Sequence, residues 1–222
     1  MTTGVPGVGV TPHGPSSRKR MALRWWLWSA VSAPPAILLH EVGHFAVLWG
    51  MNVPGAALHY ASADHPRSRE YARAVIDGDL AAAAEITPLW GAVLALAMGL
   101  VATYVVVFLC CYLSAKWKAH PALVAMGYLS NFRITAALWI LVHPIFGITV
   151  DAGCDECWLA RLTGIPLAVW TLPGVVSLVW AGIFLWKFFP ARNRWVAVTA
   201  TVLGMATGVA SWAGFLGPWL LP

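Results

Sequence analysis

Long apolar stretches alternate with short polar segments along this chain, and the length of the apolar stretches determines the fold class. About 20 apolar residues in an α-helix cover the 30 Å hydrocarbon core of a bilayer. Five stretches reach that length, so the pattern predicts an all-α, polytopic membrane protein, a bundle of about five transmembrane helices. The predicted spans cover residues 21–51, 89–113, 122–143, 167–189 and 196–221.

The first predicted span is too long for a straight helix across the bilayer. At 1.5 Å per residue, residues 21–51 would form a helix of about 45 Å. Pro34 and Pro35 fall near its middle, and each proline lacks an amide hydrogen and clashes with the preceding turn. We therefore expect a kink there, with residues 36–50 as the second helical half.

The residues before this span are rich in Gly, Pro, Thr and Ser, a composition typical of disorder. We expect a disordered cytoplasmic tail over residues 1–20 and one transmembrane domain over residues 21–222. Small residues at Ser32 and Ala33 also fit a cleaved signal peptide. Cleavage there would leave about 18 apolar residues, barely enough to span, so an uncleaved span is preferred.

The composition supports a membrane protein, because 59% of the 222 residues are hydrophobic and only 10% are charged, whereas soluble domains carry about 25% charged residues. The net charge of +5 would suit nucleic acid. The basic residues, however, lie in short clusters before the first span and after the second and fourth, so the expected partner is a lipid bilayer and not nucleic acid. By the positive-inside rule, the N-terminus is cytoplasmic and the C-terminus is outside.

The segment between the first two spans, residues 52–87, is polar. Within it, residues 67–85 are predicted to form a short surface helix broken at Gly78. His59 and His65 are isolated in this segment and are interpreted as surface histidines.

The first span contains the sequence His-Glu-Val-Gly-His at residues 40–44. On a helix, His40 and His44 lie on one face, so both imidazoles can reach one metal ion. Glu41 lies about 100° around the helix and can face a water molecule instead. Two nitrogen ligands, an open position for water and a carboxylate that takes its proton are what zinc hydrolysis requires. Ionisable residues inside a span are costly, which favours a Zn²⁺ site over a chance match.

The third metal ligand must come from elsewhere, because a catalytic zinc site usually has three protein ligands. Under the expected topology, the segment after the third span emerges on the same side of the membrane as the motif. Its carboxylates are Asp151, Asp155 and Glu156. The residues alone leave all three available; if Asp155 is the ligand, Glu156 would point away from it on a helical turn.

The third span contains two polar residues, Asn131 and Arg133, at a depth comparable with that of the histidines. In one interpretation they make internal contacts between spans, for example Arg133 with Glu85. In the other they belong to the catalytic site and help to stabilise charge on the reacting carbonyl oxygen.

The H-E-x-G-H-F sequence in the first of several spans, followed later by an aspartate near a membrane end, resembles the site-2 protease family of intramembrane zinc metalloproteases. This resemblance implies that His40, His44 and an aspartate bind zinc and that Glu41 is the catalytic general base. It also implies a transmembrane protein substrate that is cut within or beside the bilayer.

The same resemblance favours Asp155 as the third ligand. In smaller relatives the aspartate precedes a short helix that ends in Gly-Ile-Pro, and here Asp155 precedes that sequence at residues 164–166. Other members place the aspartate before glycine in an Asn-Pro…Asp-Gly stretch. Asp151 matches that pattern only in part, because Asn-Pro is missing.

Two other classes of function remain open. Cys154 and Cys157 form a C-x-x-C pair that would suit a membrane thiol-disulfide oxidoreductase. The second pair, Cys110 and Cys111, is adjacent and lies toward the opposite membrane face, so a disulfide that closes the acidic loop is preferred. A non-enzymatic scaffold or transporter would need neither motif. The sequence is therefore interpreted as a zinc-dependent intramembrane endopeptidase that cleaves a transmembrane or membrane-adjacent peptide.

Overall fold

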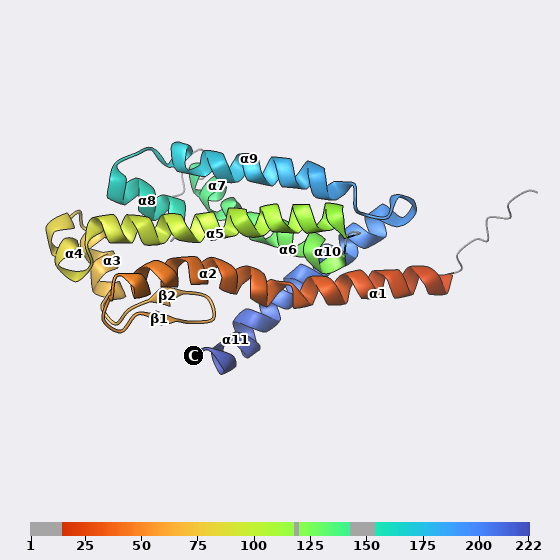
Figure 1. The fold of residues 1–222 in the computed structure, drawn as a ribbon, viewed down its shortest axis with the longest axis horizontal. Coiled ribbons are helices and arrows are strands. Elements are labelled where there is room, and N and C mark those ends of the chain that lie inside the picture. Colours follow the sequence, from red (N-terminus) through yellow and green to blue (C-terminus); the bar gives the residue numbers. More distant parts are fainter. Residues whose placement is uncertain (1–14, 118–119, 143–153) are drawn as a thin grey trace, which may run out of the picture.

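The computed structural model describes residues 15–117, 120–142 and 154–222, and these residues are mostly helical (Figure 1). Five of their helical segments are long and apolar enough to cross a membrane, which confirms the predicted all-α, multi-pass fold. These segments are Ser17–Gly50, Leu89–Lys116, Pro121–Ile140, Leu167–Trp186 and Ala191–Leu220.

Several spans consist of more than one helix. The helices of the spans are α1 (Pro15–Val31) and α2 (Ala33–Gly50), then α5 (Leu89–Lys116), then α6 (Pro121–Phe132) and α7 (Ile134–Val142), then α9 (Leu167–Trp186), and finally the 3₁₀ turn η2 (Ala191–Asn193), α10 (Arg194–Ser211), the π-helical η3 (Trp212–Leu216) and α11 (Gly217–Leu220). The shorter elements between spans are β1 (Ala57–Leu58), β2 (Ala63–Asp64), α3 (Ser68–Ile76), α4 (Leu80–Ile86) and α8 (Asp155–Thr163).

The first span breaks at Ser32, between α1 and α2. Pro34 and Pro35 lie in the first turn of α2. Amide groups in the first turn have no carbonyl partner within the helix, so the missing amide hydrogens cost no helical hydrogen bond. The hydroxyl of Ser32 donates to the Ser29 carbonyl at 2.7 Å. A break in the first span is therefore present near the predicted place, and the second helical half begins at Ala33 instead of residue 36.

The predicted boundary of the N-terminal tail is wrong. Residues 15–20, which we expected to be disordered, form the first turns of α1. Arg, Lys and Met are good helix formers, so the helix of the span continues backwards through this basic segment. The remainder of the expected tail, residues 1–14, lies outside the described residues.

The third span was predicted as one helix over residues 122–143, but it is interrupted. Helix α6 ends at Phe132 and α7 begins at Ile134, which leaves Arg133 at a junction between two helices. The interruption positions Arg133 beside α2 and α8.

The two ends of the bundle carry different elements (Figure 1). At one end, a hairpin of β1 and β2 and the helices α3 and α4 connect α2 to α5, and α8 leads into α9. The predicted break of the surface helix at Gly78 is confirmed, because this residue separates α3 from α4 with a φ of +77°. The hairpin was not predicted. The C-terminal segment contacts it, since Nε1 of Trp212 donates to the carbonyl of Tyr60 at 2.8 Å.

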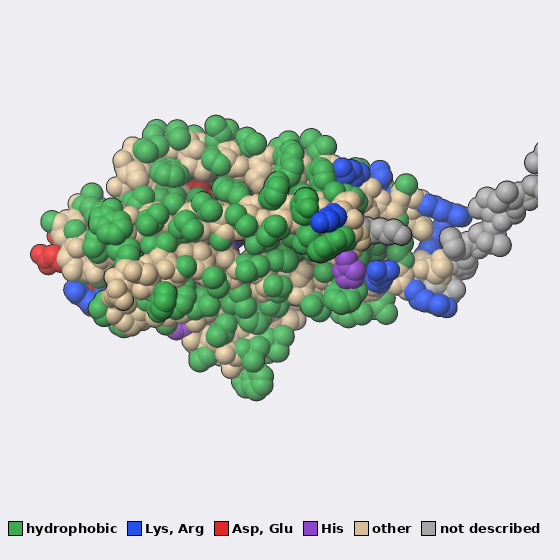
Figure 2. Space-filling view, in the orientation of Figure 1, with side chains coloured by type: hydrophobic (Ala, Val, Ile, Leu, Met, Phe, Trp, Pro, Cys, Tyr) green, Lys and Arg blue, Asp and Glu red, His purple; other side chains and the backbone are tan. Residues whose placement is uncertain are grey.

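The face of the bundle that Figure 2 shows is largely apolar. Only 17–44% of the residues in the spanning windows are buried inside the protein, so most apolar side chains face outward, as expected in lipid. Lys and Arg gather at the end where α1 begins (Figure 2). We call this the basic end; its apolar core includes Trp25, Val107, Val124, Leu185 and Phe189.

Candidate metal centre

Three side chains from two helices converge inside the bundle. His40 and His44 come from α2, and Asp155 is the first residue of α8. The Nε2 atoms of the two histidines lie 2.8 Å apart. Oδ2 of Asp155 lies 3.0 Å from Nε2 of His40 and 3.4 Å from Nε2 of His44. The structure therefore brings the three predicted ligands into a group that could hold one metal ion.

These spacings suit zinc. In a tetrahedral site with bonds of 2.0–2.1 Å, neighbouring donor atoms are about 3.3 Å apart. The three measured separations, 2.8, 3.0 and 3.4 Å, are close to that value. Two imidazole nitrogens and one carboxylate oxygen are ordinary zinc donors, and three protein ligands leave a fourth position for water or substrate.

Helix α5 orients both imidazoles. Nδ1 of His40 lies 2.9 Å from Oγ1 of Thr103, and Nδ1 of His44 lies 2.9 Å from the Ala95 carbonyl oxygen. A carbonyl oxygen only accepts, so Nδ1 of His44 donates and its Nε2 keeps a free lone pair. Such partners on the far nitrogen are usual for metal-binding histidines. Sequence reasoning missed Thr103; the available signal was a hydroxyl within an apolar span.

Gly99 allows α5 to lie this close to the motif. A Cβ atom at this position would lie 2.3 Å from the His44 ring. On the facing helix, a Cβ atom at Gly43 would lie 2.5 Å from the Met98 carbonyl oxygen. The glycine of the H-E-x-G-H sequence therefore has a packing role, which places both histidines directly against α5.

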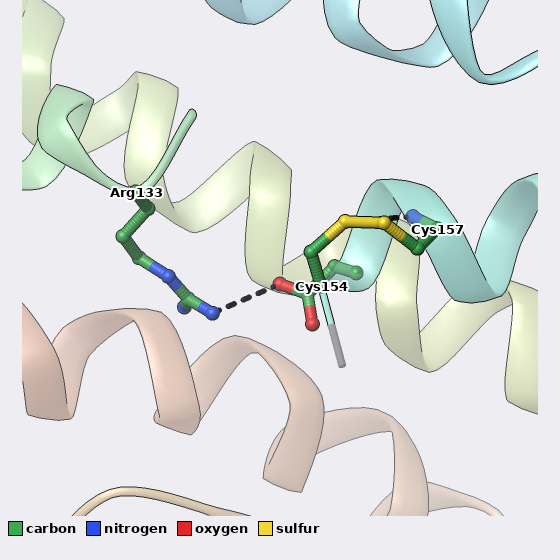
Figure 3. Close-up of a disulfide and its surroundings, with 4 residues drawn as sticks. Arg133, Cys154 and Cys157 are labelled. Atoms are coloured by element: carbon green, nitrogen blue, oxygen red, sulfur yellow. Dashed lines mark hydrogen bonds and ion pairs between the residues drawn. A yellow bond between two sulfur atoms is a disulfide. The ribbon is translucent and has the colours of Figure 1, made fainter. Parts of the chain in front are cut away.

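Helix α8 forms where the family resemblance implied a short helix: it runs from Asp155 to Thr163 and is capped by a left-handed Gly164 with a φ of +70°. Cys154 precedes the helix, and its Sγ accepts from the amide of Cys157 at 3.1 Å. The two cysteines form a disulfide, so the predicted loop disulfide is present (Figure 3). This arrangement holds the first turn of α8, where the amide groups favour a carboxylate.

Asp155 is in a suitable protonation state for a ligand. Burial raises the pKa of its carboxyl group, but the neighbouring His44 ring and the positive charge of Arg133 lower it by more. The pKa of Asp155 therefore lies below its ordinary value, and the carboxylate is ionised at neutral pH. Metal binding requires this form.

Arg133 connects the ligand carboxylate to the predicted general base. Figure 3 shows its side chain extending from the α6–α7 junction toward the start of α8, where Nη2 lies 3.3 Å from Oδ2 of Asp155. Its Nη1 lies 3.7 Å from Oε1 of Glu41, which in turn lies 4.0 Å from Nε2 of His40. The alternative contact with Glu85 is wrong, because that residue is exposed on α4.

Asn131 does not share this role. Its Oδ1 accepts from Oγ of Ser177 at 2.7 Å, and its Nδ2 donates to the Gly127 carbonyl at 3.3 Å. Both ends of the amide are therefore engaged, and the side chain joins α6 to α9. Of the two polar residues noted in the third span, Arg133 contacts the candidate metal centre and Asn131 joins two helices instead.

Glu156 follows Asp155 but lies outside the ligand group, as expected. Its burial was not expected, since only 5% of the residue is exposed. Burial raises the pKa of Glu156 above its ordinary value. The residue lines a cavity of about 360 Å³ on the His40 side of the ligands, together with Tyr104 and Ser130.

A second cavity, of about 380 Å³, extends from Glu41 and His44 toward the hairpin and α3. Its lining is partly polar, and the polar side chains beyond the ligand group include Ser62, Asp64, His65, Ser68 and Thr87. The cavity gives water and a peptide segment space beside the ligands.

The remaining histidines and cysteines singled out in the sequence do not join the ligand group. His59 lies 3.2 Å from Asp64, and His65 lies 3.3 Å from Thr87. Both histidines are partly buried, so their interpretation as surface residues was only approximate. Cys110 and Cys111 are buried, free thiols in the second half of α5.

Asp151, the alternative third ligand, lies outside the described residues. No protein-family model, characterised protein or solved structure matches this chain. The candidate metal centre is therefore judged on its own geometry.

Proposed function

We propose that this protein is a zinc-dependent intramembrane endopeptidase that cleaves a transmembrane or membrane-adjacent peptide. The observation that carries the proposal is the convergence of His40, His44 and Asp155, with separations of 2.8–3.4 Å, beside the carboxylate of Glu41. This set combines a metal-binding group with a separate acid-base residue, which hydrolysis of an amide requires.

In this proposal His40, His44 and Asp155 hold zinc, which when bound supplies a Lewis acid for a peptide carbonyl and for water. Glu41 accepts a proton from the attacking water and returns it to the amine leaving group. It is mostly buried, with 7% of the residue exposed, so bulk water does not screen its charge.

Arg133 is the residue that stabilises negative charge on the carbonyl oxygen. Its guanidinium has N–H groups beyond those directed at Asp155 and Glu41, and its side chain lines both cavities. Fixed positive groups of this kind stabilise the developing oxyanion.

The depth of the centre supports a substrate that lies in the membrane. His44 and His40 precede the end of α2 at Gly50 by 6 and 10 residues, or about 9 and 15 Å along the helix. The cavity of about 380 Å³ leads from this depth to the polar hairpin end. A peptide leaving the bilayer at that end could reach Glu41 without crossing the packed core.

The charge distribution supports one orientation, with the basic end in the cytoplasm and the metal centre nearer the outside. In a background without the native cysteines, an impermeant thiol reagent added from outside should label Asp64→Cys but not Lys116→Cys. Labelling of the second variant alone would reverse the orientation and leave the proposed chemistry intact.

The oxidoreductase alternative is less well supported. The disulfide of Cys154 and Cys157 could exchange with a thiol, but Cys154 is buried. Cys110 and Cys111 are buried free thiols in the second half of α5, and neither lines the cavity that Cys154 lines.

The test compares purified wild-type protein with Glu41→Gln on a library of quenched fluorescent transmembrane peptides in detergent micelles. We expect cleavage by the wild type, a loss of about 10²–10⁴-fold in the variant, and unchanged zinc content. Cys154→Ser is the control for the oxidoreductase alternative and should retain most of the cleavage. A variant Glu41→Gln that cleaves like the wild type would refute the proposed role of Glu41.

A further inference from the structure

A cluster of three arginines and two tryptophans surrounds a hollow at the basic end, where α9 ends and α10 begins. The hollow has a volume of about 420 Å³, and its charged lining is Arg18 from α1 with Arg192 and Arg194 from the α9–α10 connection. Trp186 and Trp195 form its aromatic sides. We call these five residues the arginine pocket. It is far from the candidate metal centre and has no part in the proposed hydrolysis.

The arginines of the pocket have no anionic partner within the described part of the chain. The ion pairs formed there involve none of Arg18, Arg192 and Arg194. The described acidic residues lie on α2, β2, α3, α4 and α8 and in the turns beside α3 and α4, none of which forms the pocket. Three positive charges therefore face one hollow without compensation.

Arg194 is held in place by the pocket itself. Its guanidinium carbon lies 5.2 Å from the centre of the Trp186 ring, and that ring contacts Trp195 at 5.6 Å between centroids. Nε of Arg194 is buried and has no hydrogen-bond partner. A buried donor without a partner is costly, and an acceptor bound in the hollow would remove that cost.

The position of the pocket identifies the class of ligand. The fourth span ends at Trp186 and the fifth begins at Ala191, so the pocket lies at the membrane surface. Tryptophans prefer the headgroup level, and the amino end of α10 adds a favourable dipole for an anion. Arginine matches phosphate oxygens with paired N–H groups. Trp195 is 72% exposed and offers an apolar surface beside the phosphate level.

We propose that the arginine pocket binds the phosphate of an anionic phospholipid, with the acyl chains lying along the outer faces of α9 and α10. Exposed Ile183 and Val196 supply apolar surface there. Such a site would fix the basic end at one leaflet and would stabilise the α9–α10 connection. Basic pockets between spans are a recognised arrangement for anionic headgroups.

The experiment is native mass spectrometry of the full chain in detergent, with equal amounts of phosphatidylglycerol and phosphatidylcholine added. The test variant is Arg192→Gln/Arg194→Gln. The matched control is Lys19→Gln/Lys116→Gln, which removes the same charge from exposed positions at the same end. We expect one phosphatidylglycerol retained by the wild type and control, and a loss of affinity on the order of 30-fold in the test variant.

Three results would overturn the proposal. Equal lipid retention by the test and control variants would show that only net charge matters. Displacement of the lipid by soluble glycerol phosphate at similar concentration would show that the pocket binds free phosphate and not a lipid. If the test variant unfolds at a lower temperature than the wild type, Arg192→Gln alone is measured, because the exposed side chain of Arg192 has no packing role. Lipid retention by Arg192→Gln equal to that of the wild type would also contradict the proposal.

Discussion

The two ends of this bundle use the same residue types in opposite ways. At the candidate metal centre, Arg133 contacts two carboxylates that are largely buried, and the ionisable groups compensate one another. At the basic end, Arg194 has no carboxylate partner among the described residues and lies against Trp186. Charge that is paired inside the bundle positions a reacting group, whereas charge left unpaired at its surface is available to the membrane.

The packing differs in the same way. The basic end has an apolar core in which Val107, Val124 and Leu185 are fully or almost fully buried. Around the metal centre the helices are joined by polar contacts, a disulfide and two cavities. We therefore expect substitutions at the basic end to lower stability, and substitutions at the other end to lower zinc affinity and activity.

The largest expected effect on stability is at the basic end. Leu185→Ala should lower the free energy of unfolding by about 2–5 kcal/mol, because the side chain is fully buried and leaves a cavity. Zinc content of the folded protein should not change. Ile183→Ala, at a position that is 73% exposed, is the matched control and should be nearly neutral. Thermal unfolding in detergent measures the stability of both variants. A loss of zinc in folded Leu185→Ala would contradict the view that the basic end serves stability and the other end serves zinc binding.

Among residues other than the three ligands and Glu41, Arg133 should have the largest effect on activity when replaced, and Arg133→Gln tests this. We expect kcat to fall by about 10²–10³-fold, because the charge that faces the carbonyl oxygen is lost. Arg133→Lys should recover little of that activity, since one ammonium group cannot contact Glu41 and Asp155 as the planar guanidinium does. Full recovery by lysine would mean that Arg133 contributes only charge and does not position the two carboxylates.

Gly99→Ala tests whether α5 orients the histidines. The added Cβ atom would lie 2.3 Å from the His44 ring and displace it. Loss of a well-oriented ligand should weaken zinc binding by about 10–100-fold, measured by competition with a chelator. Gly182→Ala on α9 is the control, because a Cβ atom there meets nothing within 4 Å. Equal zinc affinity in the two variants would contradict the role assigned to α5.

Local signals in the sequence account for the parts that were predicted correctly. The histidine spacing of four residues and the proline pair each act over one or two helical turns. They predicted the motif helix and the break in the first span, whereas the short helix that begins at Asp155 was expected from the family resemblance and not from a local signal.

Contacts between segments that are distant in the sequence could not be predicted from such local signals. The interruption at Arg133, the hairpin and the burial of Glu156 all depend on which helices pack together. Thr103 becomes a partner of His40 only because Gly99, which has no side chain, lets α5 lie close to α2. No pattern within a single span contains that information.

The most direct test of the account is the zinc content of four purified proteins: wild type, His44→Ala, Asp155→Ala and Asp151→Ala. We predict about one zinc per chain in the wild type and in Asp151→Ala. Both other variants should lose most of the metal, because two remaining ligands hold zinc weakly. A chain without zinc, or a site emptied by Asp151→Ala and not by Asp155→Ala, would contradict the assignment of His40, His44 and Asp155 as the metal ligands.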